Sequence, residues 1–364
     1  MDIEAKIELI TRSPAEEIIL PEELRSLLET EAHPIAYGGW EPSGPVHLGT
    51  GLVCAYKMKD LIGAGVRFKA YLATWHAWMN NKLGGDMAKI RLAAEHFRHS
   101  WIACGVPEDK IEFIWPEQEY DDLEYWQIVV NAARHLTVAR VTRTLEIAGR
   151  KSTEALNVAH YMYTPMQVAD IFRFGVRIAQ LGMDQRKANV VAREIGPALG
   201  FWKPVCVHHH LLQGLAKPAV WPLPSDPAAK KEALSAVKMS KSKPNTCVFT
   251  YDEPDAIRAK ISGAFCPEKQ TEFNPILDIA RQIVFHDRQS LKVNRPAKFG
   301  GPVEFGSADE LERAFAAGSL HPMDLKSAVA ESLVEILEPV RTYFAKHKKA
   351  AEGRDMLMGA QITR

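Results

Sequence analysis

Cysteine is scarce in this sequence, and no two cysteines form a Cys-x-x-Cys pair. An odd number of widely spaced cysteines does not fit a disulfide framework, and without close pairs it does not fit a structural zinc site. The pattern is typical of a protein kept in a reducing compartment, so we expect a cytoplasmic location. The five cysteines are Cys54, Cys104, Cys206, Cys247 and Cys266.

Net charge and long apolar stretches are also missing. The 364 residues include 45 basic and 45 acidic side chains, so no overall field attracts nucleic acid, and any RNA contact must use local patches. No apolar run is long enough to cross a bilayer, and residues 1–31 lack the pattern of a secretion signal. We therefore expect no membrane association.

Hydrophobic periodicity predicts a βαβ unit near the N-terminus. Residues 35–40 resemble a buried strand, a turn (EPSG) follows, residues 47–62 have helical spacing, and residues 66–76 form a second strand-like run. Ligands of such units bind at the carboxyl ends of the strands, where His47 and His76 are expected. The predicted fold class is α/β, with a Rossmann-like parallel sheet.

The rest of the chain alternates helical and strand-like segments up to about residue 250 and is largely helical from Pro254 to Lys349. This change predicts a separate α-helical domain. Before it, helices are expected at 86–104, 123–150 and 166–180, strands at 111–115 and 205–208, and an irregular excursion at 216–229.

Two short motifs indicate adenylate chemistry. Residues 45–49 (PVHLG) place His47 and a glycine turn at a predicted helix start, where backbone N–H groups favour phosphate. Residues 238–242 (KMSKS) place Lys238 and Lys241 on a predicted loop. Either motif alone fits a capping histidine or a solvated loop, but together they fit the two halves of an ATP site that stabilises charge on an α-phosphate.

Longer segments make the sequence similar to tyrosyl-tRNA synthetases of the archaeal and eukaryotic type, which are class I aminoacyl-tRNA synthetases. The resemblance spans roughly residues 30 to 345. It rests on residues 37–44 (YGGWEPSG), 163–170 (YTPMQVAD), 182–187 (GMDQRK), 298–301 (KFGG) and 321–326 (HPMDLK).

The resemblance implies a division into domains. Residues 1–30 are then a helical leader, and residues 31–250 form the class I catalytic domain, with dimerisation helices inserted around 120–160. Residues 251–349 form an α-helical anticodon-binding domain, and residues 350–364 form a flexible tail. A homodimer is implied as well.

The resemblance also implies roles in binding tyrosine. Tyr37 and Asp170 should bracket the phenolic hydroxyl of the substrate, and Tyr163, Gln167 and Gln185 should hold its α-amino end. The spacing agrees, because residues 163, 167 and 170 share one helix face. Without the resemblance, this spacing would fit a polar edge of an amphipathic helix. His76 matches a histidine of the same site.

ATP and its accompanying Mg²⁺ are the implied co-substrate. The implied ATP ligands combine the first motif, a ribose-binding acid and the lysine loop. His47, Lys238 and Lys241 are the implied catalytic residues. The set is His47, Gly49, Thr50, Asp184, Lys238, Met239, Ser240, Lys241 and Ser242. No protein-held metal is expected: His208, His209 and His210 are consecutive, so on a strand they point to alternate faces.

The implied tRNA contacts fall in two regions. The acceptor stem should be held by its phosphates, although a solvated helix face explains the charges equally well. The residues are Arg134, Arg140, Arg143, Arg150 and Lys151 on one expected helix and its end, with Arg186 and Lys187. Phe299 and Asp324 should stack on and hydrogen-bond the first anticodon base.

Several residues depart from the family pattern. Thr50 replaces the second histidine of the first motif, while Lys241 completes a full KMSKS. Tyr71 and Thr74 stand where relatives have a smaller apolar residue and an aspartate. Glu119 and Tyr120 lie in a segment that lines the pocket of relatives.

The sequence predicts a tyrosine–tRNA ligase acting on tyrosine, ATP and tRNA(Tyr). Two alternatives stay open at this point. One is a specialised homologue that uses a tyrosine analogue or an acceptor other than tRNA. The other is a catalytically silent paralogue that binds RNA.

Overall fold

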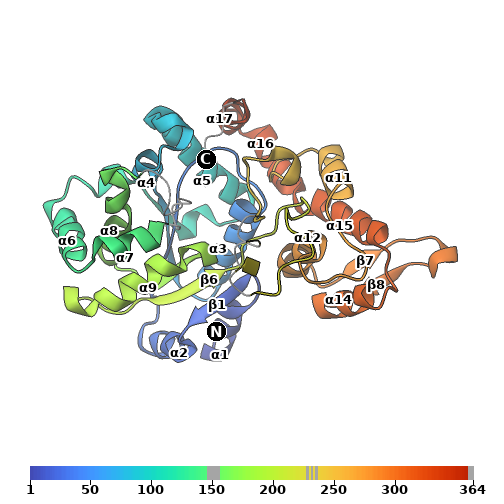
Figure 1. Ribbon diagram of the computed structural model, residues 1–364, viewed down its shortest axis with the longest axis horizontal. Helices are drawn as coiled ribbons and strands as arrows, with labels where there is room; N and C mark the ends of the chain where they lie inside the picture. Colours follow the sequence, from blue (N-terminus) through green and yellow to red (C-terminus); the bar gives the residue numbers. More distant parts are fainter. Residues whose placement is uncertain (146–155, 227–228, 231–232, 234–236, 360–364) are drawn as a thin grey trace. The chain divides into compact units, whose positions relative to one another are not determined.

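The computed structural model describes residues 1–145, 156–226, 229–230, 233 and 237–359 (Figure 1). The chain divides into two compact units. Unit 1 contains residues 1–44, 56–210 and 352–364, and unit 2 contains residues 45–55 and 211–351. The first motif and the lysine loop therefore belong to the same unit, although almost 200 residues separate His47 from Lys238.

A six-stranded sheet forms the centre of unit 1, in the order β1-β6-β5-β2-β3-β4. Its strands are β1 (Ala15–Ile19), β2 (Ile35–Trp40), β3 (Arg67–Leu72), β4 (Ile111–Ile114), β5 (Ile178–Gly182) and β6 (Val205–His209). All neighbours are parallel except β1, which pairs antiparallel with β6. The chain builds outward from β2 in both directions, so the carboxyl ends of β2 and β5 form the switch point where such sheets bind ligands. The predicted Rossmann-like fold class is confirmed.

Helices surround this sheet and supply most of the candidate site. Figure 1 shows α6, α7 and α8 grouped at one end of unit 1. The helices are α1 (Ile3–Thr11), α2 (Pro21–Thr30), α3 (Cys54–Gly63), α4 (Thr74–Met79), α5 (Met87–Ala103), α6 (Leu123–Arg134), α7 (Val138–Thr144), α8 (Val158–Arg173) and α9 (Arg186–Ile195). In the described part of the chain, no helix is both long and apolar enough to span a membrane.

The N-terminal segment differs from the purely helical leader that the sequence suggested. Between α1 and α2 the chain forms β1, whose Ile18 pairs with Val207 and whose Ile19 pairs with Cys206. Isoleucine favours a strand, and the exposed edge of β6 offers a partner that the local sequence does not reveal.

Further elements differ from the expected ones. Within the described residues, the helix expected at 123–150 is two helices, α6 and α7, because the chain leaves the helix between Arg134 and Val138. The helix expected at 166–180 ends at Arg173, because Gly175 adopts a left-handed φ of 67° and the chain then enters β5. The strand expected at 66–76 ends at Leu72, and His76 lies on the short helix α4 instead.

The C-terminal segment is more ordered than the flexible tail expected at 350–364. Residues Lys348–Met358 form the helix α17. Leu357 is buried with Ala77, Leu83 and Ile90 of unit 1. This apolar contact anchors the helix.

Unit 2 is mainly helical, as the sequence predicted for the region beyond Pro254. Its helices are α11 (Pro254–Ser262), α12 (Pro275–Ile279), α13 (Phe285–Asp287), α14 (Ala308–Ala316), α15 (Pro322–Ile336) and α16 (Glu338–Lys346). A small hairpin of β7 (Leu291–Val293) and β8 (Val303–Phe305) was not predicted. Its three-residue strands are too short to show an alternating pattern.

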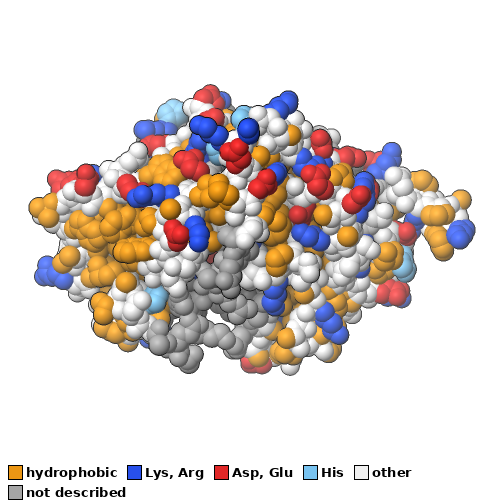
Figure 2. Space-filling view, turned by 90° about the horizontal axis from the view of Figure 1, so that it is seen from above, with side chains coloured by type: hydrophobic (Ala, Val, Ile, Leu, Met, Phe, Trp, Pro, Cys, Tyr) orange, Lys and Arg blue, Asp and Glu red, His pale blue; other side chains and the backbone are white. Residues whose placement is uncertain are grey.

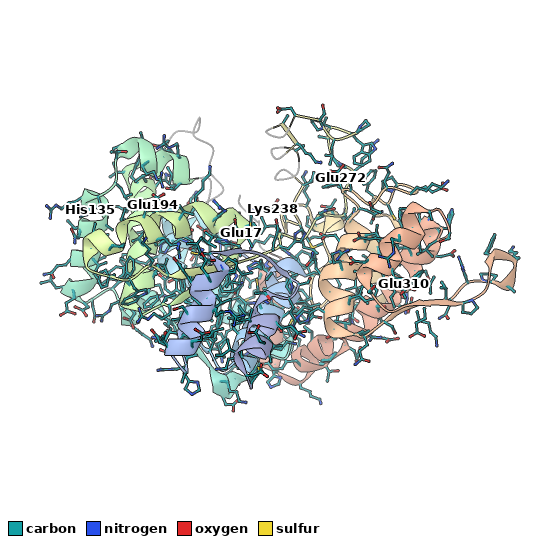
Figure 3. All side chains as sticks on the ribbon, turned by 90° about the horizontal axis from the view of Figure 1, so that it is seen from below. Glu17, His135, Glu194, Lys238, Glu272 and Glu310 are labelled. Carbon is teal, nitrogen blue, oxygen red and sulfur yellow. The ribbon has the colours of Figure 1, made fainter. Side chains whose placement is uncertain are left out.

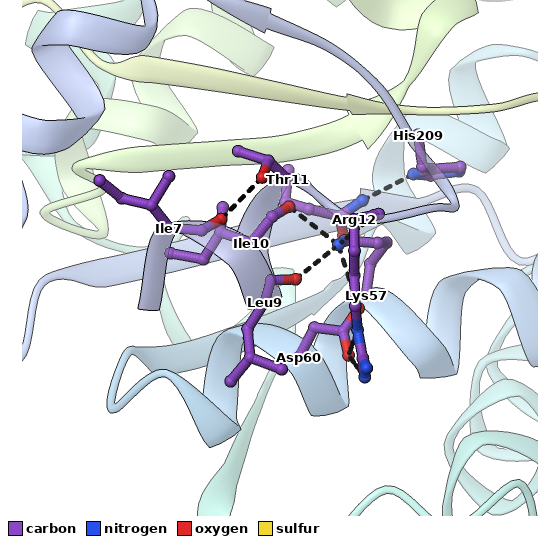
Figure 4. Close-up of polar contacts among 9 residues, drawn as sticks. Ile7, Leu9, Ile10, Thr11, Arg12, Lys57, Asp60 and His209 are labelled. Atoms are coloured by element: carbon purple, nitrogen blue, oxygen red, sulfur yellow. Dashed lines mark hydrogen bonds and ion pairs between the residues drawn. The ribbon is translucent and has the colours of Figure 1, made fainter. Parts of the chain in front are cut away.

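A buried lysine ties α3 to the N-terminal helix of unit 1 (Figure 4). Lys57 Nζ donates to the carbonyl oxygens of Leu9, Ile10 and Arg12 at 3.2, 2.9 and 3.1 Å, and lies 3.1 Å from Asp60 Oδ2. The Arg12 guanidinium pairs with the other oxygen of Asp60. Burial lowers the pKa of Lys57 to about 8, and the Asp60 charge opposes that shift.

Replacing this lysine should destabilise the fold. In Lys57→Met the three carbonyl groups lose their donor and Asp60 loses one cation, so we expect unfolding to become easier by about 3–5 kcal/mol. Lys59→Met is the matched control, since Lys59 Nζ reaches a single carbonyl at 3.3 Å. In this variant the free energy of unfolding should fall by only about 1 kcal/mol, the value of one hydrogen bond. Urea unfolding measures the stability of both variants. An equal loss of stability in the two would contradict the structural role assigned to Lys57.

Candidate functional site

A cluster of buried polar side chains lies next to the switch point of unit 1. Helix α8 places Tyr163, Gln167 and Asp170 on one face, and all three are buried. Tyr37 enters from β2 and is also buried, whereas Gln185 ends the short 3-10 helix η6 (Met183–Gln185) that follows β5. The expected tyrosine-binding residues therefore converge in space.

Asp170 is the carboxylic acid of this cluster whose pKa is shifted most. Its Oδ1 accepts hydrogen bonds from the hydroxyls of Tyr125 at 3.0 Å and Tyr120 at 3.1 Å. Its Oδ2 lies 3.7 Å from His76 Nε2. Burial raises the pKa of Asp170 to about 8, the two tyrosine hydrogen bonds lower it, and the nearby charge of Glu119 adds to the increase.

His76 is neutral in this environment. Burial lowers its pKa to about 4. Its ring contacts Tyr163 edge-on, with 4.6 Å between ring centroids. An uncharged imidazole beside Asp170 can take part in hydrogen bonding, but it does not neutralise the carboxylate.

Some polar atoms of this cluster are buried without a hydrogen-bond partner. Within the described part of the chain, Thr74 Oγ1 and Gln167 Oε1 are buried and make no hydrogen bond. The Gln167 amide instead donates to Gln185 Oε1 at 3.5 Å. Buried polar atoms of this kind are costly unless a partner satisfies them, so they favour a polar ligand.

Two residues of this site were not predicted from the sequence. Tyr125 on α6 lies 45 positions before Asp170, and no local pattern marks it. Glu41 directly follows β2, so its place at the carboxyl end of a central strand was a usable signal. Its carboxylate accepts from Asn80 Nδ2 at 3.0 Å and lies 3.4 Å from Lys82 Nζ. Burial and the Glu41 charge both raise the pKa of Tyr163.

In unit 2, the first motif forms a tight turn rather than the start of a regular α-helix. Residues Gly49–Val53 form a short π-helix that leads into α3, and His47 pairs with Phe249 through an isolated β-bridge. Gly51 is required here, because a Cβ atom at this position would lie 2.3 Å from Thr250 Cγ2. The missing side chain thus lets the turn pack closely.

The orientation of His47 fixes its hydrogen-bonding role. The backbone N–H of Gly49 donates to His47 Nδ1 at 3.1 Å, so the ring proton resides on Nε2. Burial lowers the pKa of His47 to about 3, and the charges of Lys241 and Lys238 add to this effect. His47 is therefore a neutral donor near two cations.

The lysine loop follows an anchored segment. Lys238, which is labelled in Figure 3, forms an isolated bridge with Gln213, and Met239 N donates to Leu212 O at 2.7 Å. The hydroxyls of Ser240 and Ser242 lie 2.9 Å apart. This part of unit 2 can present positive charge to an anion.

Thr50, which replaces the second histidine, faces the turn itself. Its hydroxyl donates to His47 O at 3.3 Å and lies at the same distance from His47 N. Asp184, the expected ribose-binding acid, lies in unit 1 on η6 and is partly exposed.

The expected acceptor-stem residues gather on α7 and α9. Lys187 Nζ donates to Arg143 O at 3.4 Å, and both side chains are exposed. Arg186 pairs with Glu17 at 2.8 Å, and Arg140 pairs with Glu194; both acids are labelled in Figure 3. Carboxylates thus offset part of the basic charge. Arg150 and Lys151 lie outside the described residues.

The expected anticodon residues lie in a loop and at a helix start of unit 2. Phe299 is 59% exposed and stands in the loop between β7 and β8. Asp324 lies in the first turn of α15. Arg295 connects the two regions, since it donates to Gly301 O and to Ser319 O, each at 2.8 Å.

The three consecutive histidines have separate partners. His208 contacts Glu17 Oε2 at 2.9 Å, His209 contacts Gln180 at 2.6 Å, and His210 contacts Glu16 Oε2 at 2.8 Å. Their side chains stabilise β1, β5 and β6.

Comparison with known proteins agrees with this arrangement. Residues 29–338 match the family described as tRNA synthetases class I (W and Y). The chain is 46% identical to the tyrosine–tRNA ligase of Thermococcus kodakarensis over the full length of both chains. It is also 46% identical to that of Aeropyrum pernix, over 94% of this chain and 93% of the relative.

Solved structures show the same relationship. The tyrosyl-tRNA synthetase of Pyrococcus horikoshii, crystallised with L-tyrosine, superposes with a TM-score of 0.93 at 43% identity, covering 98% of this chain and 100% of that one. The tryptophanyl-tRNA synthetase of Aeropyrum pernix shares only the fold, with 16% identity and a TM-score of 0.64 over 94% and 86% of the two chains. The chain thus belongs to the class I aminoacyl-tRNA synthetases, within the tyrosyl-tRNA synthetase family of archaeal type.

Proposed function

We propose that this chain is a tyrosine–tRNA ligase. A carboxylate oxygen of tyrosine attacks the α-phosphorus of ATP, and pyrophosphate leaves with the bond electrons. A terminal ribose hydroxyl of tRNA(Tyr) then attacks the acyl carbon, and AMP leaves. The observation that carries the proposal is the buried Asp170 carboxylate, which faces aromatic and polar side chains suited to a phenol.

Recognition of tyrosine follows from this pocket. Asp170 and Tyr37 bind the ring hydroxyl, His76 borders it, and Tyr163, Gln167 and Gln185 hold the amino end. Phenylalanine would leave the buried carboxylate without the hydroxyl as a partner, which is the general reason why such sites reject it. Tyrosyl-tRNA synthetases are the standard example of this effect, with a preference of about 10⁵ for tyrosine over phenylalanine.

ATP is bound by residues of the two motifs. His47 donates from Nε2 to a phosphate oxygen, while Lys238 and Lys241 neutralise the charge that develops as pyrophosphate leaves. Gly49, Thr50, Met239, Ser240 and Ser242 shape the turn and the loop. Asp184 is the proposed ribose-binding acid. Mg²⁺ enters with the triphosphate, whose oxygens are its preferred ligands.

Pyrophosphate exchange with each amino acid tests the activity. We expect tyrosine to drive exchange far better than phenylalanine or tryptophan. Exchange driven best by another amino acid would instead identify a specialised homologue. Binding of tRNA without any exchange would identify a silent paralogue, and either result overturns the proposal.

Removing one loop cation should slow the first step. In Lys241→Ala we expect kcat for exchange to fall about 10²–10³-fold, as for loss of one donor to transition-state charge, with a small effect on KM for tyrosine. Lys243→Ala removes an exposed cation just outside the motif and is the control. An unchanged kcat in Lys241→Ala would remove Lys241 from the catalytic set.

Transfer RNA binds at two regions of this chain, in our proposal. Arg143, Arg186 and Lys187 contact acceptor-stem phosphates. Phe299 stacks on the first anticodon base while Asp324 hydrogen-bonds its edge. The exposed ring of Phe299 and its anchored loop support this role.

Loss of the Phe299 ring should affect charging but not activation. We expect kcat/KM for tRNA aminoacylation to fall about tenfold to a hundredfold in Phe299→Ala, because stacking on one base is worth about 1–3 kcal/mol. Pyrophosphate exchange should not change, and Phe299→Tyr should restore charging. Equal charging by Phe299→Ala and the unmodified protein would refute the contact.

A homodimer completes the proposal. Figure 2 shows hydrophobic side chains gathered at the end of unit 1 where Figure 1 places α6. The exposed apolar residues of the neighbouring helices include Leu123 and Val130 on α6, Val138 on α7 and Val158 on α8. A second copy of the chain would cover this face.

The free thiols of the five cysteines suit a reducing cytoplasm.

A charge on this face should break the dimer. We expect Val130→Asp to sediment as a monomer at micromolar concentration, because a carboxylate in an apolar interface is left unpaired. Val220→Asp, at an equally exposed valine of unit 2, should remain dimeric. A monomeric unmodified protein would contradict the proposal.

A further inference from the structure

Three tyrosines form a chain of hydroxyl groups that ends at Asp170. Tyr120 and Tyr125 both donate to Oδ1 of the carboxylate, and the hydroxyl of Tyr71 contacts that of Tyr120. A phenol carries one proton. Because Tyr120 uses its proton for Asp170, the proton in the contact between the Tyr71 and Tyr120 hydroxyls must come from Tyr71.

Packing holds these hydroxyls in place. Tyr71, Tyr120 and Tyr125 are 2%, 6% and 0% exposed. The rings of Tyr120 and Tyr125 stack with centroids 4.3 Å apart, and Tyr71 packs against Phe174 at 5.3 Å. The donors therefore need no reordering when a ligand enters, which is the condition for a preorganised site.

The two carboxylate oxygens of Asp170 differ in the hydrogen bonds that they accept. Oδ1 already accepts two hydrogen bonds, whereas Oδ2 faces His76 at 3.7 Å, beyond hydrogen-bond distance. We infer that Tyr120 and Tyr125 are positioning residues that fix the Asp170 carboxylate so that Oδ2 receives the substrate hydroxyl, and that Tyr71 supports them through Tyr120. This inference rests on the proposed binding of tyrosine at Asp170.

The same contacts predict a pH dependence. The ionised carboxylate is the stronger acceptor, so tyrosine binding should weaken as the pH falls through the Asp170 pKa of about 8. Hydrogen bonds from Tyr120 and Tyr125 lower this pKa, so their loss should move the weakening to higher pH. The other titratable groups around Asp170 are Tyr37 of β2, Tyr71 of β3, His76 of α4 and Glu119 before α6.

Single hydroxyl deletions test the inference in the full-length enzyme. We expect Tyr125→Phe and Tyr120→Phe to raise KM for tyrosine about tenfold in pyrophosphate exchange, with kcat almost unchanged, since a hydrogen bond to a charged group is lost. The pH at which KM begins to rise should increase in both variants. Tyr56→Phe removes the hydroxyl of another buried tyrosine and should have neither effect.

A double variant examines the chain of hydroxyls itself. Tyr71→Phe alone should have a smaller effect on KM than Tyr120→Phe, and it should add nothing in the Tyr120→Phe background, because the connection to Asp170 is already broken there. Full additivity would show that Tyr71 acts independently and would overturn its supporting role.

The possible failures are distinguishable. If the unmodified enzyme shows no tyrosine-dependent exchange, the proposed function fails. If it is active but Tyr120→Phe and Tyr125→Phe match Tyr56→Phe in KM and pH profile, the inference alone fails. Thermal unfolding of each variant identifies any loss of folding, and equilibrium binding of tyrosine then reports on whichever variant remains folded.

Discussion

A buried carboxylate is the constraint on which the proposed tyrosine site depends. Asp170 sits inside unit 1, where its charge is costly unless other groups stabilise it. Helix α8 supplies the acid, while α6 and the segment before it supply two hydroxyl donors. The pocket thus requires the correct packing of elements that are distant in sequence. If Asp170 binds the phenol as we propose, selectivity also depends on residues that do not belong to the family signatures.

The elements of unit 2 that we propose to bind phosphate meet a different constraint. Lys238 and Lys241 lie near the His47 imidazole, and their charges would repel it if it were protonated. Burial and the Gly49 N–H keep His47 neutral, with its proton on Nε2. A neutral donor and two cations can then act on the same anion, because none of them has to lose charge as the anion binds. The turn that makes this possible depends on the close approach of Gly51 to Thr250.

Sequence reasoning was most successful where a local pattern reports the structure. The βαβ unit is such a case, and so is the i, i+4, i+7 spacing that places residues 163, 167 and 170 on one face of α8. It failed where distant contacts decide. Tyr125 approaches Asp170 only because α6 packs on α8, and β1 forms only because β6 presents an edge. The helix α4 was missed for a related reason: its six residues continue an apolar run that resembles a strand.

Thr50 departs from the family signature, and its hydroxyl makes a local hydrogen bond in the turn. A histidine at this position would offer a second imidazole to a ligand, whereas the shorter threonine hydroxyl bonds to the backbone of His47. The turn gains a contact that a longer ring would not make in the same way. In the proposed ATP site, the turn then has one donor fewer for phosphate, and the complete KMSKS supplies Lys241 as a further cation. A lysine side chain can deliver charge without fixed geometry, so in the proposed ATP site the directional hydrogen bond to phosphate comes from His47, whose ring is held by the Gly49 N–H.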